Sequence, residues 1–181
     1  MEYTTHSEEE TLALAGRFAE KVRPGTMIAL NGDMGAGKTV FARGFARGLG
    51  ITERIQSPTF TILQVYESGR LPLYHFDVYR LAPQEETLVG AKEQASSPEA
   101  EEALLDIGCE EYFDGDGVCL VEWADLVARI LPQDAIRIWI GREEGQEETR
   151  VIKVEAPCAS TLEPFKFEPG SRSKLNVSEK G

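Results

Sequence analysis

The sequence predicts an α/β fold in which a mostly parallel sheet is flanked by helices and extended by antiparallel hairpins. The chain has 181 residues, of which 41% are hydrophobic and 28% charged, and this length and composition are ordinary for one globular domain. The apolar run 27–30 predicts a buried strand that continues into a glycine-rich turn and then a helix at 38–49. A fully apolar strand is expected at 118–121, again just before a predicted helix.

The N-terminal half begins with a helix signal and ends with a hairpin signal. Ser7 followed by Glu10 forms a capping box, and apolar residues then recur at helical spacing up to Val22. This helix should end near Arg23-Pro24-Gly25, because proline and glycine stop helices. Two strands, 59–66 and 71–76, are expected to form a hairpin around the Ser-Gly-Arg turn between them.

The C-terminal half is less regular. The polar stretch 91–103 contains Pro98 and few aromatic residues, which predicts a mobile insertion. Short helices are expected at 104–113 and 123–131, the second ended by Pro132. Strands 135–140 and 150–155 should pair across the acidic loop 142–149.

The expected domain organisation is simple. Residues 1–156 should form one domain that carries an acidic insertion at about 83–106. The tail, 157–181, contains three prolines and few large apolar residues, so we expect it to be loosely ordered.

The net charge of −12 is concentrated in one segment. Residues 83–116 contain eleven acidic residues and one lysine, a local charge of −10, which leaves −2 for the rest of the chain. Nucleic acids are bound through Lys and Arg that neutralise phosphates, so this balance disfavours an autonomous nucleic-acid binder. The acidic segment is either a solvated helical face or a docking surface for a basic partner.

The sequence also bears on compartment. No apolar run approaches the roughly 20 residues needed to span a bilayer, and the acidic N-terminus is unlike a secretory signal. Cys109, Cys119 and Cys158 cannot all pair within one chain and form no CxxC pattern, so they indicate neither a disulfide framework nor a zinc site. We expect a cytoplasmic protein with free thiols and no membrane partner.

The strongest chemical signal is a complete G-x-x-x-x-G-K-[ST] phosphate-binding loop, the Walker A motif. Its glycines let successive backbone N–H groups point at phosphate oxygens. Its lysine supplies charge for the β and γ phosphates, and its threonine hydroxyl can bind Mg²⁺. We therefore expect a P-loop NTPase-like fold that binds a nucleoside triphosphate through a continuous set of residues: Gly32, Asp33, Met34, Gly35, Ala36, Gly37, Lys38 and Thr39.

Two acidic residues stand where predicted strands end. Asp77 follows one strand of the predicted hairpin, and Glu122 follows the strand 118–121. P-loop proteins hold Mg²⁺ with an acid at such a strand end, although a strand-end carboxylate can also be merely exposed. Two of them in one P-loop domain favour a site for metal and water. Because the sequence contains no Asn-Lys-x-Asp guanine-reading motif, ATP is favoured over GTP.

Four further motifs follow the phosphate loop in order: SPTF at 57–60, YHFDVYRL at 74–81, IGCEEYF at 107–113 and VEW at 121–123. With the loop they span roughly residues 7–155, and over this length the chain resembles the TsaE (YjeE) family. These are small bacterial ATPases of tRNA threonylcarbamoyladenosine biosynthesis. The resemblance implies a P-loop sheet flanked by helices, a cytoplasmic location and partnership with the TsaB–TsaD heterodimer. It also implies that ATP hydrolysis supports turnover of the tRNA-modifying enzyme and that this subunit does not itself transfer the threonylcarbamoyl group.

Carried over position by position, the resemblance implies that Lys38 binds phosphate and that Thr39 binds Mg²⁺. It also implies that five other residues belong to the site: Thr59, Asp77, Glu122, Trp123 and Arg80. Thr59 resembles a switch-like threonine near the γ-phosphate and the metal. Asp77 and Glu122 match two acidic positions of the family, whose implied role is to position Mg²⁺ or water. Trp123 is similar to a family tryptophan beside the site, with core packing as the alternative, and Arg80 would assist there. His75 is interpreted as a satisfied interior histidine.

Two other classes of function stay open. A small-molecule kinase would need a lid rich in Arg and Lys over the transferred phosphate, whereas the longest insertion here is acidic. A nucleotide-gated binding module would release negligible phosphate. The stretch between Leu81 and Ile107 is longer and more acidic than the usual family connection. In the leading hypothesis tRNA is reached only indirectly, through the protein complex.

Overall fold

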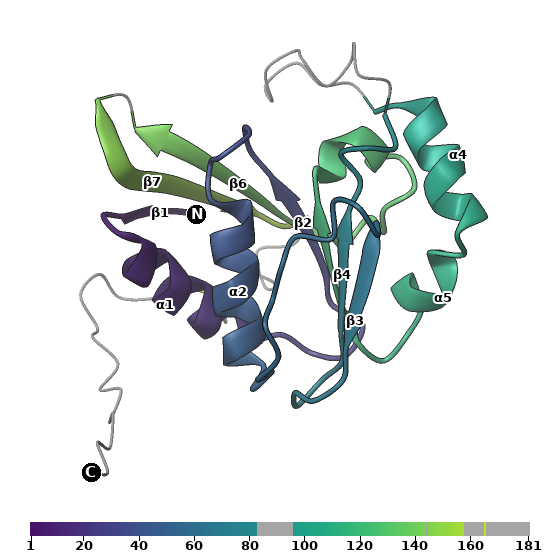
Figure 1. Ribbon diagram of the computed structural model, residues 1–181, viewed down its shortest axis with the longest axis horizontal. Coiled ribbons are helices and arrows are strands. Elements are labelled where there is room, and N and C mark those ends of the chain that lie inside the picture. Colours follow the sequence, from purple (N-terminus) through teal and green to yellow (C-terminus); the bar gives the residue numbers. More distant parts are fainter. Residues whose placement is uncertain (83–95, 144, 158–164, 166–181) are drawn as a thin grey trace.

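The computed structural model describes residues 1–82, 96–143, 145–157 and 165. Within these ranges one seven-stranded sheet carries helices on both faces (Figure 1). In chain order the elements are β1 (Glu2–Thr5), α1 (Glu8–Ala19), β2 (Met27–Asn31), α2 (Lys38–Gly48), β3 (Leu63–Tyr66), β4 (Leu73–Asp77), α4 (Pro98–Asp106), α5 (Glu110–Phe113), β5 (Val118–Glu122), the 3₁₀ turn η1 (Ala124–Val127), β6 (Ile136–Glu143) and β7 (Gln146–Glu155).

The sheet is mixed, and its strand order is β1-β7-β6-β2-β5-β4-β3. The four central strands β6, β2, β5 and β4 are parallel. Antiparallel strands complete both edges, with β3 on β4 at one side and β7 and β1 beyond β6 at the other. The α/β fold predicted from the sequence is confirmed. Parallel pairing is confined to the centre, where β2 lies between β5 and β6.

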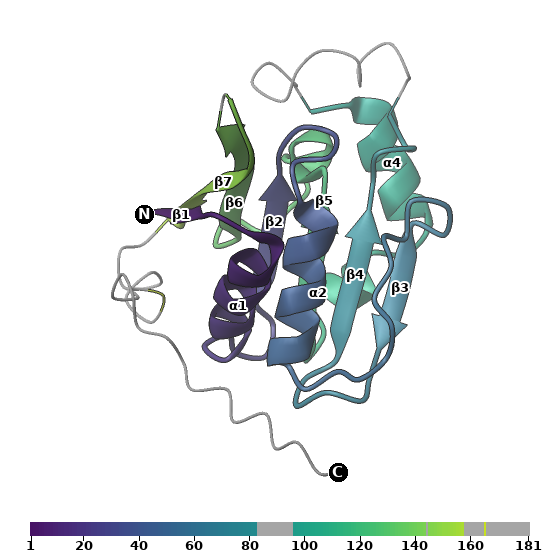
Figure 2. The same ribbon diagram turned by 60° about the vertical axis from the view of Figure 1, so that its left-hand side comes forward.

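Two hydrophobic clusters cover the two faces of the sheet. Ile28 and Leu30 pack with α1 and α2 on one face, and Met27 and Ala29 pack with α4 and η1 on the other. Burial on both sides explains why β2 is apolar without alternation. Figure 2 shows α1 and α2 side by side in front of the sheet, with α4 beside β4.

Glycines let α1 and α2 approach closely. A Cβ at Gly44 would lie 2.3 Å from the carbonyl oxygen of Leu12, and one at Gly48 would lie 2.4 Å from the carbonyl oxygen of Gly16. A glycine in a helix interior ordinarily costs about 1 kcal/mol relative to alanine. Here the absence of side chains permits backbone contact between the two helices, which accounts for Gly44 within a predicted helix.

Two expectations for residues 91–113 were wrong. Pro98 does not interrupt a mobile insertion but opens α4, because the first turn of a helix needs no N–H at that position. Ser97 caps this helix, its hydroxyl accepting from the Ala100 amide at 3.4 Å. The expected helix 104–113 is divided, since Gly108 has a φ of +76° between α4 and α5. The remainder of the predicted insertion, residues 83–95, lies outside the described residues.

Other element boundaries also differ from expectation. The helix predicted at 123–131 is only the short turn η1, and the predicted loop 142–149 largely belongs to β6 and β7, with Gly145 at a φ of +79°. The first helix ends earlier, at Ala19. The strand expected from residue 59 begins at Leu63, because a turn closes on the carbonyl oxygen of Pro58.

Strand β1 and Phe165 are two further described features near α1. Strand β1, which the sequence did not predict, pairs with β7 with Glu2 opposite Lys153. Phe165 is buried and stacks on Phe18 with ring centroids 5.0 Å apart. The other tail residues after 157 lie outside the described residues. In the described ranges no helix is long and apolar enough to cross a membrane.

Candidate nucleotide and metal site

The phosphate loop joins the end of β2 to the start of α2, as predicted. Gly32, Gly35 and Gly37 have φ angles of +140°, +73° and +112°, conformations that side-chain-bearing residues rarely adopt. At Gly32 there is also no room, because a Cβ would lie 2.2 Å from the carbonyl oxygen of Ile140. Gly37 precedes α2 without a side-chain cap, so backbone N–H groups at the helix start have no side-chain acceptor there and suit an anion.

Lys38 is buried at the mouth of this loop. Its Nζ donates to the carbonyl oxygens of Gly32 (2.6 Å) and Asp33 (2.9 Å) and lies 3.7 Å from the ring centroid of Trp123. Burial lowers the pKa of Lys38 to about 8, and the negative charges of Glu122, Asp77 and Asp33 oppose this shift. The ammonium group is thus held in a low-dielectric position where phosphate oxygens would be stronger partners than neutral carbonyls.

Asp77 is surrounded by donors from two segments. Its Oδ2 accepts from the hydroxyls of Ser57 (2.6 Å) and Thr59 (2.5 Å), and its Oδ1 accepts from the Tyr79 amide (3.1 Å). The Ser57 and Thr59 hydroxyls are themselves 2.7 Å apart. The structure therefore brings together Asp77, which follows a predicted strand, and Thr59, which the family resemblance implied near the γ-phosphate.

Glu122 lies beside Asp77, since the two are register partners at the ends of the parallel strands β4 and β5. Both carboxylates are buried. Glu122 Oε1 is 2.8 Å from Nε2 of the fully buried His75. The carboxylate can only accept when ionised, so we assign the proton to Nε2. His75 Nδ1 has no hydrogen-bond partner in the described part of the chain; the histidine is interior as expected, but only one of its nitrogens is satisfied.

Trp123 and Arg80 differ in their relation to the site. Trp123 contacts Lys38, as noted, and its amide donates to the carbonyl oxygen of Leu30 at 3.0 Å, tying the end of β5 to β2. Arg80 instead stacks over Phe60, with its Cζ 4.1 Å from the ring centroid. Phe60 is 82% exposed, so this pair stands at the surface beside Thr59. Thr39 lies in the first turn of α2 next to Lys38.

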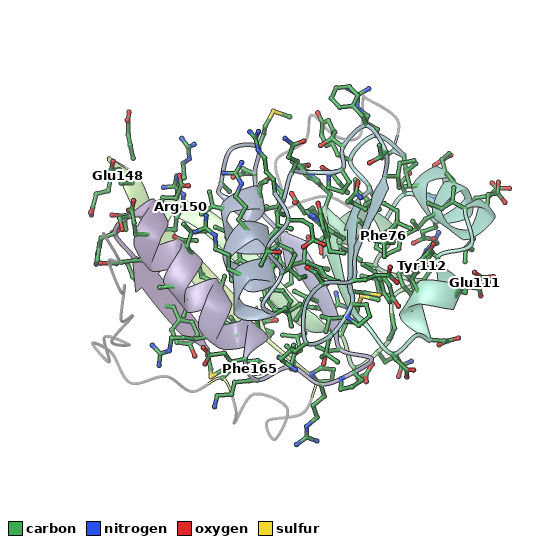
Figure 3. All side chains as sticks on the ribbon, turned by 60° about the horizontal axis from the view of Figure 1, so that its bottom comes forward. Phe76, Glu111, Tyr112, Glu148, Arg150 and Phe165 are labelled. Atoms are coloured by element: carbon green, nitrogen blue, oxygen red, sulfur yellow. The ribbon has the colours of Figure 1, made fainter. Side chains whose placement is uncertain are left out.

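Two arginines that sequence reasoning missed hold the outer side of the phosphate loop. Arg142 donates to the carbonyl oxygen of Gly35 (Nη2 at 2.7 Å), and Arg150 donates to that of Ala36 (Nε at 2.7 Å). Both come from the β6–β7 hairpin, and Figure 3 shows Arg150 on the α1 side of the molecule. Because they bind carbonyls, they favour the loop orientation in which the N–H groups point inward. No local sequence motif identifies these two arginines, because their contact with the phosphate loop depends on how β6 and β7 pair.

The donor set fits Mg²⁺. In the described ranges no group of three or more His, Cys, Asp or Glu side chains forms a metal cage. Mg²⁺ usually needs only one or two carboxylates together with phosphate oxygens and water. Asp77, Glu122 and the Thr39 hydroxyl offer the hard oxygen ligands that such a site uses.

The fold and this site define the class of protein: it has a P-loop NTPase-like fold in which the phosphate loop faces two strand-end carboxylates. The family model "Threonylcarbamoyl adenosine biosynthesis protein TsaE" matches residues 5–152. The chain belongs to the TsaE family, and the resemblance stated from its motifs is confirmed.

Individual relatives agree with this assignment. The tRNA threonylcarbamoyladenosine biosynthesis protein TsaE of Bacillus subtilis (strain 168) is 45% identical over 147 residues, 81% of each chain. The TsaE protein of Treponema pallidum (strain Nichols) is 44% identical over 125 residues, 69% of this chain and 77% of that protein. The crystal structure of YdiB from Bacillus subtilis matches with a TM-score of 0.67 at 40% identity, covering 86% of this chain and 84% of that one.

Proposed function

We propose that this protein binds and hydrolyses ATP with Mg²⁺ as an accessory subunit required for N6-threonylcarbamoyladenosine modification of tRNA. It would act in the cytoplasm on a TsaB–TsaD complex. Membership of a family whose relatives are named for this biosynthesis supports the pathway. The observation that carries the ATPase proposal is the pairing of Asp77 with Glu122 beside the buried Lys38.

The chemistry proposed for each residue follows from its contacts. Lys38 would exchange two neutral carbonyl partners for the β and γ phosphate oxygens, a gain because the acceptors would then carry negative charge opposite the ammonium. Mg²⁺, when bound, would neutralise charge on the phosphates, and the Thr39 hydroxyl with the carboxylates of Asp77 and Glu122 would hold it.

The acids also suit the orientation of an attacking water. His75 fixes the Glu122 carboxylate by a hydrogen bond to Oε1. Thr59 reaches Asp77 from a segment that begins with an exposed turn, so a γ-phosphate that recruits the Thr59 hydroxyl would compete with that contact. In this way Thr59 would report the nucleotide state to the neighbouring surface that carries Phe60.

Nucleotide binding tests the proposal directly. Lys38→Ala removes the buried cation of the loop and should abolish productive ATP binding measured by titration calorimetry. Lys153→Ala, which removes an exposed lysine of β7 paired with Glu2 at 3.8 Å, is the matched control and should bind normally. Unchanged ATP binding by folded Lys38→Ala protein would reject the nucleotide site.

Phosphate release distinguishes the accessory ATPase from the other functional classes. We expect slow release by the chain alone, faster release with TsaB–TsaD present, and ATP-dependent capture of that complex. Formation of ADP that needs a small-molecule acceptor and gives no free phosphate would instead identify a kinase, because the phosphoryl group would then be on the acceptor. Capture of the complex without phosphate release would identify a nucleotide-gated binding module.

The charge distribution supports indirect access to tRNA. With −12 overall, the chain has few opportunities to neutralise several phosphates at once, which counterion release requires. Filter binding of labelled tRNA to the isolated chain should give weak or no retention at physiological salt. Tight, salt-sensitive retention would contradict this part of the proposal.

A further inference from the structure

A cavity of about 430 Å³ lies toward the end of α2 that is remote from the phosphate loop. Its walls come from Arg43 and Arg47 of this helix and from the segment 51–55 that follows it. The eleven residues of α2 rise about 16 Å along the helix axis. Figure 2 shows α2 running from the phosphate loop at its upper end down toward the turn between β3 and β4. The cavity is therefore separate from the nucleotide site.

Three arginines line this cavity, and two of them lack a partner. Arg43 lies 4.0 Å from Glu8, and both side chains are substantially exposed, so this ion pair contributes only about 0–1 kcal/mol. Arg47 and Arg54 are exposed, and their side chains form no hydrogen bond or ion pair within the described part of the chain. Two guanidinium groups at one cavity are thus available to an anion from outside.

The one acidic residue in the lining, Glu53, is engaged within its own loop. Its Oε2 accepts from the Thr52 amide at 3.1 Å and from the Ser68 hydroxyl, and the hydrogen bond from Ser68 lowers the pKa of Glu53. Three arginines and one glutamate give the lining a net charge of +2, whereas the whole chain carries −12. This local reversal of sign favours an anionic ligand.

The spacing and the floor of the cavity favour carboxylates on a peptide. Arg43 and Arg47 are one helical turn apart, about 6 Å, and acidic side chains on alternate residues of an extended peptide are about 7 Å apart. A guanidinium group can hold a carboxylate through two parallel hydrogen bonds. Ile51 and Ile55 are 4% and 5% exposed and line the same cavity, so they offer apolar contacts to the methylene groups of a glutamate. A nucleic acid is less suited, because three cations neutralise few phosphates.

We propose that this cavity binds an acidic segment of a partner protein, with carboxylates on alternate residues meeting Arg43, Arg47 and Arg54. The proposal concerns protein recognition and does not depend on ATP hydrolysis. A partner seated here leaves the phosphate loop accessible, because the two sites lie toward opposite ends of α2. It would also contact the segment leading to Ser57, whose hydroxyl donates to Asp77.

The experiment measures binding of a fluorescein-labelled peptide of six glutamates by fluorescence anisotropy at low ionic strength. Wild-type protein should bind this peptide, and the affinity should fall as salt is added. The double variant Arg47→Gln with Arg54→Gln should bind about tenfold more weakly, the size expected for two exposed ion pairs. Both residues are exposed, so the variant should unfold at the wild-type temperature.

A matched control makes the same charge change outside the cavity. Arg23→Gln with Lys153→Gln removes two exposed cations that do not line it and should bind the peptide like wild type. No binding by wild-type protein, or an equal loss in the two double variants, would overturn the proposal. An oligouridylate of six nucleotides that binds more tightly than the peptide, and through the same arginines, would assign the cavity to RNA instead. Self-association that only Arg47→Gln with Arg54→Gln abolishes would assign it to a second copy of the chain, and either result would overturn the proposal.

Discussion

ATP binding should weaken as pH rises through 8, because Lys38 is buried. Its pKa is lowered from 10.5 to about 8 by burial, so in the free protein the ammonium loses its proton at a pH where an exposed lysine keeps it. A bound triphosphate brings negative charge to Nζ and stabilises the charged form. ATP should therefore bind the protonated protein preferentially, and its binding should take up a proton at alkaline pH.

The size of the effect follows from that pKa. If only the charged form binds, the dissociation constant for ATP rises about eightfold between pH 7.5 and pH 9. Proton uptake on binding should be about a quarter of a proton at pH 7.5 and about 0.9 at pH 9. The last phosphate proton of a phosphate monoester leaves near pH 6, so the ligand itself contributes little in this window.

Calorimetry in two buffers of different ionisation enthalpy measures both quantities. Lys38→Arg is the control, because a guanidinium stays charged throughout this range; whatever affinity it retains should not vary with pH. Equal affinity of the wild-type protein at pH 7.5 and pH 9, or an equal pH dependence in Lys38→Arg, would refute the reasoning.

Three further predictions concern the residues around the phosphate loop. Asp77→Asn and Glu122→Gln should each keep the thermal unfolding temperature close to wild type but slow phosphate release about a hundredfold or more, the usual contribution of a positioned catalytic or metal-holding group; near-normal release with partners present would remove that residue from the site. His75→Ala, which deletes the donor to Glu122, should slow release about tenfold while ATP affinity holds, and His75→Gln, which restores a side-chain N–H, should recover most of the rate; equal losses in both variants would count against the positioning role. Arg150→Met removes the donor to the Ala36 carbonyl and should weaken ATP binding about five- to tenfold by calorimetry, whereas Lys153→Met on the same strand should not.

The sequence predicted the centre of this molecule better than its periphery. The strand, loop and helix around Lys38 follow from local signals: an apolar run, glycines at fixed spacing and a helical pattern. Asp77 and Glu122 were recognisable because carboxylates directly follow buried strands, and the register confirms that they are neighbours. For these residues local sequence and tertiary position agree.

The errors arose where tertiary contacts override local pattern. A proline in a polar stretch can either break a helix or occupy its first turn, and the composition of the stretch does not distinguish the two. At Pro98 the N-terminal cap provided by Ser97 favours the second arrangement, and α4 begins there. The acidic loop after Arg142 became strand because β6 pairs with β7 across Gly145, and β7 then supplies the partner for β1. Arg142 and Arg150 reach the phosphate loop only through that hairpin register, so no inspection of the motif could have found them.

Backbone strain in the described residues is concentrated at the two acids. Of the non-glycine residues described, only Ile62 and Trp123 have a positive φ, at +65° and +62°. Ile62 accepts a hydrogen bond from the Asp77 amide, and Trp123 directly follows Glu122. A left-handed backbone costs roughly 1–2 kcal/mol in an ordinary residue and is least favourable in a β-branched one. Each strained residue is held in place by an amide hydrogen bond, from Ile62 to Pro58 and from Trp123 to Leu30. The bond from Trp123 to Leu30 lies at the end of β5, where the indole contacts Lys38. The bond from Ile62 to Pro58 closes the 58–62 turn, from which Thr59 reaches Asp77. The strain is thus located at two points beside Asp77 and Glu122, where the chain enters β3 and where it leaves β5.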